Sequence, residues 1–424
     1  MPTIRKLDAL EILDSRGRPT VRASCELATG ALAASSVPSG ASRGRAEAAE
    51  LRDGDPGRYR GLGCREAVRA VREVLDGELT GRSFADQRDL DQALIDTDGT
   101  EDKSRLGANA LLAVSIAFAR ANAAESAVCL RDYFAAMLGT LPKLPRPMIN
   151  LFSGGKHAGQ QVPVQDLLVV PLAASTIDEA LAMTAELYRR AVELVHDKYG
   201  MRNLTADEGG LAPAFPSQEA MFTDAAEAVG GAGLRLGEDV GLAIDVAASH
   251  FRAGDAYSWQ GELIDGEAMI GKLMGWMERY PIVSVEDGLA EDDWDNWPKL
   301  RERTAGRALI VGDDLLCTNP RRIRRAIATG AADALLLKVD QIGTLWEAAE
   351  ACRLARSAGW RVIVSARSGE TEDDWLADLA VGWAGDYIKV GSITQSERLA
   401  KYNRLLAIEA SGGLSLEPWV PPRG

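Results

Sequence analysis

The second half of the chain carries a repeat in spacing that strongly limits its possible folds. Six short apolar segments, each predicted to be a strand, end on a polar residue: Asp245, Glu286, Asp313, Lys338, Arg367 and Lys389. From Glu286 onward the steps between these residues are 27, 25, 29 and 22 residues, each long enough for one strand and one helix. The intervening segments are amphipathic, and two of them close on glycine, as helix C-termini do. Apolar strands that alternate with helices indicate a parallel sheet.

Two arrangements of such a sheet are open. Six units, with room for two further strands between Met148 and Gly241, predict an eight-stranded βα barrel. The alternative is an open doubly wound sheet, which usually carries a glycine-rich phosphate-binding fingerprint. The chain contains neither GxGxxG nor GxxxxGK[ST], so the α/β barrel is the favoured fold class.

The first 140 residues follow a different pattern. Strand-like segments come first and helical segments follow, at 4–13, 20–27 and 31–36, then at 65–76, 84–96 and 107–124. The proline-rich stretch Leu141–Pro147 cannot continue a helix and is predicted to enter a second domain. We therefore expect an N-terminal α+β capping domain over residues 1–140 and a C-terminal barrel domain over residues 141–424.

Composition limits the possible partners. Lys and Arg number 48 and Asp and Glu number 62, a formal net charge of −14, which disfavours nucleic acid and anionic membranes. The longest apolar run, 110–119, is too short to span a bilayer, and the N-terminal segment lacks a signal-peptide core. The five cysteines are scattered without a CxxC pair. We expect a cytoplasmic protein that acts on small molecules, with no nucleic-acid or membrane partner.

The polar residues at the strand ends are expected to meet at one mouth, because the active sites of βα barrels lie at the carboxyl ends of the strands. A single acid after a strand is more often a helix cap or a turn residue, but six polar ends in succession favour a site. Asp245, Glu286 and Asp313 offer oxygen ligands only, and such a set suits a hard cation such as Mg²⁺.

The remaining strand ends supply positive charge. Lys338 follows an apolar run, and a lysine near a bound metal can act as a base. Arg367 and Ser368 can hold an anionic oxygen, and Lys389 can neutralise a carboxylate. Together these groups predict that a base removes the α-proton of a metal-bound carboxylate, and that an acid then expels a β-group.

Ten segments resemble enolase, in the family's order along essentially the whole chain: ILDSRGRPTV, VPSGASRGRAEAAELRD, DGTEDKSRLGANALLAVSIA, DEGGLAP, DVAAS, VEDGLAEDDW, VGDDLLCTN, LLKVDQIGT, SARSGETEDDWLADLAVG and SERLAKYNRLLAIE. The resemblance implies an enolase-type fold, with an α+β cap packed on the barrel, and a homodimer or higher homo-oligomer. It also implies a small carboxylate and phosphate substrate, an elimination of the 2-phosphoglycerate to phosphoenolpyruvate type, and two Mg²⁺ per active site.

The resemblance also implies a role for each site residue. The ligands of the first Mg²⁺ match Asp245, Glu286 and Asp313, and the ligand of the second matches Ser42 in the SGAS loop. Lys338 matches the base that takes the α-proton, Glu208 the acid that assists departure of the β-hydroxyl, and His157 a histidine on a closing loop. Lys389 matches the residue that binds the substrate carboxylate, and Arg367 and Ser368 match phosphate contacts.

Several positions depart from the family's pattern. Where the family has S-H-R-S-G-E, this chain has SARSGE, so Ala366 replaces a histidine. Where the family has Q-E-F, this chain has QDL, so Asp166 stands where a catalytic glutamate is expected. N-G-G-S-H-A-D-N reads FSGGKHAGQ, K-V-N-Q reads KVDQ, and A-A-S-E-F reads AASHF with His250. The changes at Ala366 and Asp166 remove side-chain volume near the departing group, while the metal triad and the base are retained.

Three functional hypotheses follow. The first is a specialised lyase that expels a group larger than hydroxide, similar to the carboxyphosphonoenolpyruvate synthases of phosphonate and phosphinate biosynthesis. The second is an ordinary glycolytic enolase that tolerates the substitutions. The third, of another class, is a non-catalytic binding protein on an enolase scaffold, because a fold does not determine a function.

Overall fold

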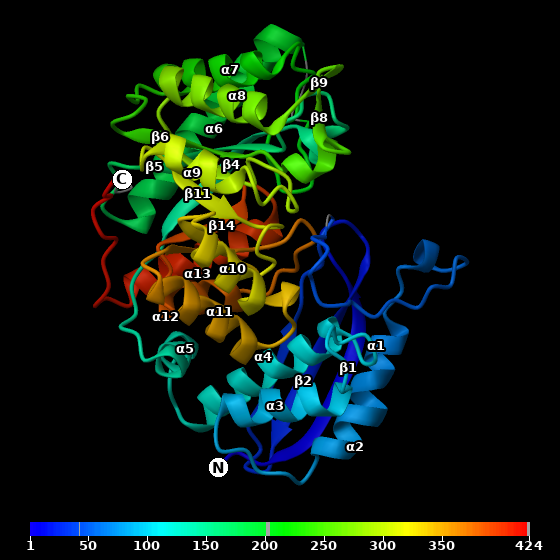
Figure 1. Cartoon of the computed structure of the whole chain (residues 1–424). Coiled ribbons are helices and arrows are strands. Elements are labelled where there is room, and N and C mark those ends of the chain that lie inside the picture. Colours follow the sequence, from blue (N-terminus) through cyan, green and yellow to red (C-terminus); the bar gives the residue numbers. More distant parts are fainter. Residues whose placement is uncertain (42, 201–203, 422–424) are drawn as a thin grey trace.

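A computed structural model describes residues 1–41, 43–200 and 204–421. The N-terminal part contains a three-stranded antiparallel sheet and the helices that cover it (Figure 1). Its elements are β1 (Ile4–Leu13), β2 (Pro19–Leu27), β3 (Leu32–Ser36), α1 (Arg65–Arg69), α2 (Asp76–Leu79), α3 (Gln87–Asp98), α4 (Ala108–Glu125) and α5 (Leu130–Leu138). A π-helical turn, Ala70–Leu75, joins α1 to α2. The α+β character expected for this part is confirmed.

Helix α4 forms the core of this domain and packs against β2 and β3. Nearly all of its residues are buried, because alanine and leucine occupy every face of the helix, as its sequence predicts. Within the described part of the chain no single helix is long and apolar enough to cross a membrane; α4 and α5 meet that test only as a pair bent by 109°.

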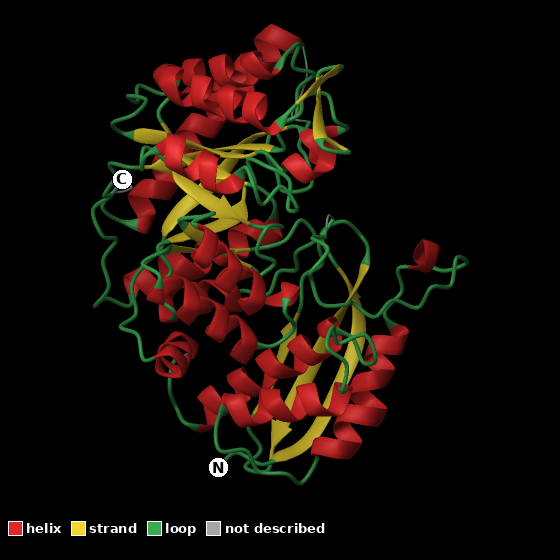
Figure 2. Cartoon of the chain, viewed as in Figure 1, coloured by secondary structure: helices red, strands yellow, loops and turns green. Residues whose placement is uncertain are grey.

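The C-terminal part is a closed eight-stranded barrel surrounded by helices (Figure 2). The barrel strands are β4 (Arg146–Ser153), β5 (Asp166–Pro171), β6 (Val240–Asp245), β10 (Ile282–Glu286), β11 (Leu309–Gly312), β12 (Ala334–Leu337), β13 (Arg361–Ser365) and β14 (Tyr387–Gly391). The outer helices are α6 (Ile177–Tyr199), α7 (Gln218–Gly231), α8 (Gly266–Arg279), α9 (Trp297–Thr304), α10 (Pro320–Thr329), α11 (Leu345–Ser357), α12 (Trp375–Gly382) and α13 (Ser396–Ala410). A small hairpin sheet, β7 (Arg252–Ala253), β8 (Ala256–Trp259) and β9 (Glu262–Ile264), lies beside it.

One strand corrects the expectation of a parallel sheet. β5 runs antiparallel to both of its neighbours, β4 and β6. The segment between β4 and β5 contains only a short 3-10 turn, Gly155–Ala158, and no crossover helix, so the chain returns in the opposite direction. This reversal brings the first residue of β5, Asp166, into register with Asp245 at the end of β6. A residue that begins a strand therefore lies among residues that end strands.

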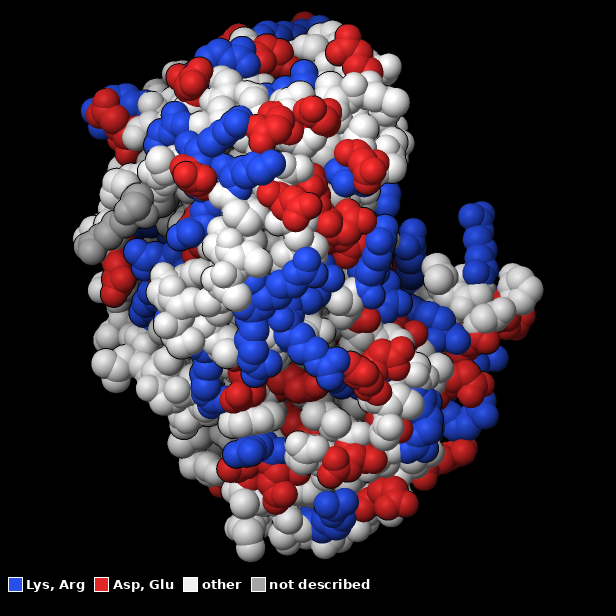
Figure 3. Space-filling model, viewed as in Figure 1, with Lys and Arg blue, Asp and Glu red and all other residues white. Residues whose placement is uncertain are grey.

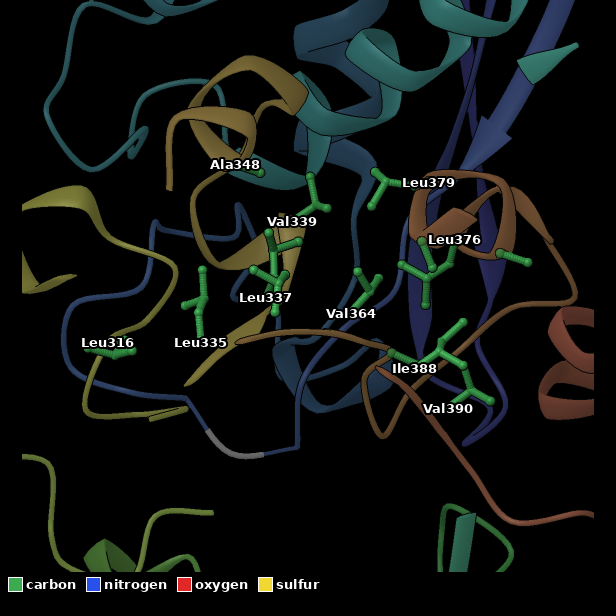
Figure 4. Packing of buried hydrophobic residues seen from close by; sticks show 14 of the residues in the cluster. Leu316, Leu335, Leu337, Val339, Ala348, Val364, Leu376, Leu379, Ile388 and Val390 are labelled. Atoms are coloured by element: carbon green, nitrogen blue, oxygen red, sulfur yellow. The ribbon is translucent and has the colours of Figure 1, made fainter. Parts of the chain in front are cut away.

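The barrel strands are buried on both faces, which explains their continuous apolar sequences. Figure 4 shows the layer outside the barrel, where Leu335 and Leu337 of β12 lie with Ala348 of α11 and Leu376 of α12. Alternate residues such as Leu336 fill the separate cluster inside the barrel. Because strand side chains alternate between faces, each strand contributes to both layers and its register is strongly specified.

The loop after β3 connects the cap to the mouth of the barrel. Ser39 forms an antiparallel bridge with Gly369, beyond the end of β13. Farther from the mouth, the Arg120 guanidinium on α4 forms ion pairs with Asp373 and Asp374 of the barrel. The segment expected to carry a metal ligand is thus held against the barrel by its own backbone.

Candidate active site

The three acids predicted to bind metal lie together at the mouth. Asp245 and Glu286 are the last residues of β6 and β10, and their neighbouring strands pair in register at these two positions. Asp313 follows β11 directly. Asp245 and Glu286 are buried and Asp313 is partly buried, so all three carboxylates have lost much of their contact with water.

Two lysines provide the counter-charges of these acids. The Lys389 ammonium lies 2.9 Å from Asp245 Oδ2 and 2.7 Å from Glu286 Oε1. The Lys338 ammonium donates a hydrogen bond to Asp313 Oδ2. Burial alone would lower the pKa of Lys338, but the charge of Asp313 raises it above its ordinary value. Both lysines predicted from the sequence therefore face the acids directly.

The pKa values of the acids reflect the crowding of negative charge at the mouth. Burial, together with the charges of Asp245 and Asp313, raises the pKa of Glu286 well above its usual range. Burial would also raise the pKa of Asp245, but Lys389 foremost lowers it, to about 2. Carboxylates in such a cluster repel one another unless positive charge is shared among them.

This donor set fits a hard divalent cation, because its ligands are carboxylate oxygens and its charge is only partly balanced by two ammonium groups. In the described part of the chain, the carboxylate oxygens of Asp245, Glu286 and Asp313 do not all lie within 4.8 Å of one another. The carboxylates would have to move together to hold one ion. A bound Mg²⁺ would supply positive charge that stabilises an enolate.

A second group of titratable side chains faces the mouth from β5 and the loop before it. His157 Nδ1 lies 2.9 Å from Asp166 Oδ2, and Ser153 Oγ donates to the other oxygen of Asp166. Ligand atoms of His157, Asp166 and Glu208 all lie within 4.8 Å of one another. Asn150 Nδ2 donates to Glu208 Oε2 at 3.0 Å. Three residues predicted from scattered motifs are thus brought together.

One proton belongs to the His157–Asp166 pair. Burial alone would lower the pKa of His157, but the Asp166 carboxylate raises it to about 9. Burial raises the pKa of Asp166. Burial would also raise the pKa of Glu208, but nearby positive charges, His157 foremost, lower it below its ordinary value. At neutral pH the pair is therefore protonated beside an ionised Glu208.

Arg367 and Ser368 lie buried at the end of β13, where the cap loop reaches the barrel. The Arg367 guanidinium is ion-paired with Asp340 and Glu47. Asp340 stands where the family's K-V-N-Q motif has asparagine, so this substituted residue contacts Arg367 in the site. Ser368 Oγ accepts hydrogen bonds from the backbone N–H of Ala41 at 2.7 Å and from Arg16 Nη1 at 3.2 Å. Ser42, the predicted second-metal ligand, lies outside the described residues.

Two residues that contact Asp313 or its backbone were not predicted from the sequence. Asp287 accepts the backbone N–H groups of Asp313 at 2.9 Å and Asp314 at 2.8 Å, and so orients Asp313. Its φ of 43° is in the left-handed region, which aspartate tolerates better than most residues. Gln341 Nε2 donates to Asp313 Oδ1 at 2.9 Å. The only available signal was their position beside predicted residues, in VED and KVDQ.

The fold and the site together define a βα barrel whose acidic strand ends suit a divalent cation and lie in contact with two lysines. Residues 4–134 match the family model described as enolase, N-terminal domain. Residues 142–415 match the model described as enolase, C-terminal TIM barrel domain. The chain therefore belongs to the enolase family, and it is an enolase-like lyase in general class.

Proposed function

We propose that the protein is a Mg²⁺-dependent lyase that acts on a 2-phosphoglycerate-type substrate and expels a β-group larger than hydroxide, as a carboxyphosphonoenolpyruvate synthase-like enzyme would. The observation that carries this proposal is that the lysines and acids of the mouth are present and in contact while two neighbouring positions carry small side chains. Lys338 contacts Asp313, and Lys389 contacts Asp245 and Glu286, the groups that would abstract the proton. Ala366 and Asp166 have smaller side chains than the histidine and glutamate of the family's pattern.

Ala366 supports this view by its position. It is buried directly before Arg367, and its backbone N–H donates to the carbonyl of Lys389 at 2.9 Å. A methyl group at this point has no donor with which to hold a leaving hydroxyl. Asp166 is engaged with Ser153 and His157. The departing group would therefore meet a wider and less polar wall than a histidine and a glutamate would provide.

The reaction that we propose needs no further reactant. With Asp313 engaged by a cation, Lys338 would lose its extra proton to solvent; its neutral Nζ would then take the proton from C2 of the substrate, and the electron pair would form the C2–C3 double bond. The β-group leaves C3 with its bonding electrons and takes the proton held between His157 and Asp166, beside Glu208. The products are an enolpyruvate and the protonated β-group. Arg367 and Ser368 would hold the phosphate, Lys389 would hold the carboxylate, and Ser42 would contribute to a second Mg²⁺.

Purified protein with Mg²⁺ and 2-phosphoglycerate tests the specialisation. We expect exchange of the α-proton with D₂O, measured by NMR, with dehydration to phosphoenolpyruvate far slower than ordinary enzyme turnover. Dehydration on the order of 10 s⁻¹ or faster would establish an ordinary enolase. Absence of exchange in the folded, Mg²⁺-saturated protein would favour the non-catalytic scaffold.

The protonated His157–Asp166 pair predicts the pH dependence of elimination. Because the pKa of His157 is raised to about 9, its proton is present at neutral pH and is lost as the pH rises through that value. We expect kcat/KM for elimination to fall above about pH 9, because kcat/KM reports the ionisation of groups of the free enzyme. In His157→Gln this decrease of kcat/KM at alkaline pH should disappear. A decrease that survives in His157→Gln would assign the proton to another group.

We also propose a homodimer or higher homo-oligomer, because the family resemblance implies one. Sedimentation equilibrium of the purified chain tests this directly: a mass of 45.4 kDa at micromolar concentration would contradict it.

A further inference from the structure

A cavity lies beside the mouth, between the loop that carries His157 and the segment that follows β6. Its volume is about 390 Å³, and its polar lining includes Lys156, Gln161, His250, Arg252, Ser258 and Gln260. This volume is roughly ten times the space of one water molecule in the liquid. The cavity is therefore large enough for a small organic anion.

The lining of this cavity is basic in a chain that is acidic overall. Lys156 and Arg252 contribute to it, and none of its described lining residues is Asp or Glu. His250 adds no charge at neutral pH, because burial lowers its pKa to about 4. Both signs of charge are interspersed over the face of the molecule in Figure 3. A separate groove between the cap and the barrel has the opposite character, with six acids among its lining residues.

Hydrogen-bonding groups of this cavity lack partners. His250 Nδ1 and Arg252 Nε are buried and form no hydrogen bond with the described part of the protein. Arg252 Nη1 is paired with Asp293 Oδ2 at 3.2 Å, which holds the guanidinium in place and leaves Nε unsatisfied. A buried donor without a partner costs about 1–3 kcal/mol. Because both atoms have almost no accessible surface, a ligand in the cavity would contact other atoms of these two side chains.

The cavity shares its walls with the active site. Lys156 directly precedes His157, which contacts Asp166. Gly155 also lines the cavity, and a Cβ there would come within 2.9 Å of Gln165 Cα; Gln165 Nε2 in turn donates to Asp245 Oδ2 at 3.3 Å. His250 lies in the 3-10 turn Ala248–Phe251, shortly after Asp245. The same two segments thus carry site residues and cavity residues.

We infer that this cavity binds an anionic group, a carboxylate or a phosphonate, of a ligand that reacts at the adjacent mouth. Lys156 supplies the charge, and the Arg252 guanidinium, partly offset by Asp293, adds to it. That a reaction takes place at the adjacent mouth rests on the proposed function. The anionic group would belong either to the enlarged β-group or to a second substrate that delivers it.

Phosphonoformate, which carries both kinds of anionic group, is the probe. We expect it to bind the Mg²⁺-loaded protein saturably by calorimetry, and Lys156→Ala to weaken its Kd at least about tenfold, which corresponds to about 1.4 kcal/mol. Lys272→Ala is the matched control, because Lys272 lies on the neighbouring helix α8 with its ammonium 5.4 Å from the Trp259 ring and does not line the cavity. That variant should bind phosphonoformate as the wild type does.

Competition with 2-phosphoglycerate separates the two sources of the anionic group. Simultaneous binding of both compounds, with dependence on Lys156, would show a pocket for a second substrate. Mutual exclusion that still depends on Lys156 would show a group carried by the same molecule. Equal Kd values for wild type and Lys156→Ala, or equal losses in Lys156→Ala and Lys272→Ala, would overturn the inference. The proposed function fails separately, through absence of α-proton exchange, which needs no phosphonoformate.

Discussion

Replacing Lys338 by glutamine should reduce exchange of the α-proton of 2-phosphoglycerate by a factor on the order of 10² to 10⁴, the usual contribution of a positioned general base. Lys338 follows β12 directly and its ammonium lies against Asp313, so it stands at the centre of the acidic mouth. No amide can take a carbon-bound proton. The measurement is loss of the α-proton signal in D₂O with saturating Mg²⁺.

Glutamine is chosen because its amide can still donate to Asp313, so that the buried carboxylate keeps a partner and the variant folds. The matched control is Lys299→Gln, on the exposed part of α9, which should exchange at the wild-type rate. Exchange in Lys338→Gln within threefold of wild type, in protein with an unchanged thermal transition, would show that another group removes the proton.

Replacing Arg398 by methionine should lower the free energy of unfolding by at least about 1.5–3 kcal/mol, the contribution of a hydrogen bond made by a charged group. Arg398 is fully buried on α13. Its guanidinium donates to the backbone carbonyls of Arg367 and Ser368, at 2.6 Å each, and to that of Asp207 at 3.3 Å. Methionine fills much of the volume but removes these three donations, and Ser368 O then keeps the contact from Ser15 Oγ at 3.4 Å.

Denaturation in guanidinium chloride measures this loss. The control is Arg321→Met, whose guanidinium pairs with Glu101 where both side chains are 78% exposed, and exposed pairs contribute at most about 1 kcal/mol. Because a lysine at this position can still donate to the backbone of Arg367 and Ser368, the proposed phosphate contacts, Arg398→Lys should regain part of the stability. Equal transitions for Arg398→Met and Arg321→Met would contradict this role.

The barrel was predictable because its strands repeat a physical pattern. Each one is an apolar segment that ends on a polar residue, followed by an amphipathic helix, and this order leaves few ways to bury both strand faces. The direction of β5 was not predictable in the same way. Its apolar segment reads like the others, and only the absence of a crossover helix between Ser153 and Asp166 makes it antiparallel.

The candidate site was predicted in its membership but not in its pairings. Motifs indicated Lys338, Lys389 and the acidic triad, yet no motif indicates that Lys389 bridges Asp245 and Glu286 while Lys338 pairs with Asp313. Asp287 was missed for a similar reason. Its contribution is to accept the N–H groups of a strand end 26 residues away, and such a contact leaves no local pattern.

The sequence by itself determined the fold class, the family and the residue types of the mouth, because apolar periodicity and motif order are properties of the chain read in one dimension. The tertiary structure decided which charges meet and which remain without partners. Titration depends on burial and distance, so the raised pKa of His157 exists only once its loop and β5 are folded and Asp166 lies beside it. The basic cavity around Lys156 likewise forms only where two segments distant in sequence face each other.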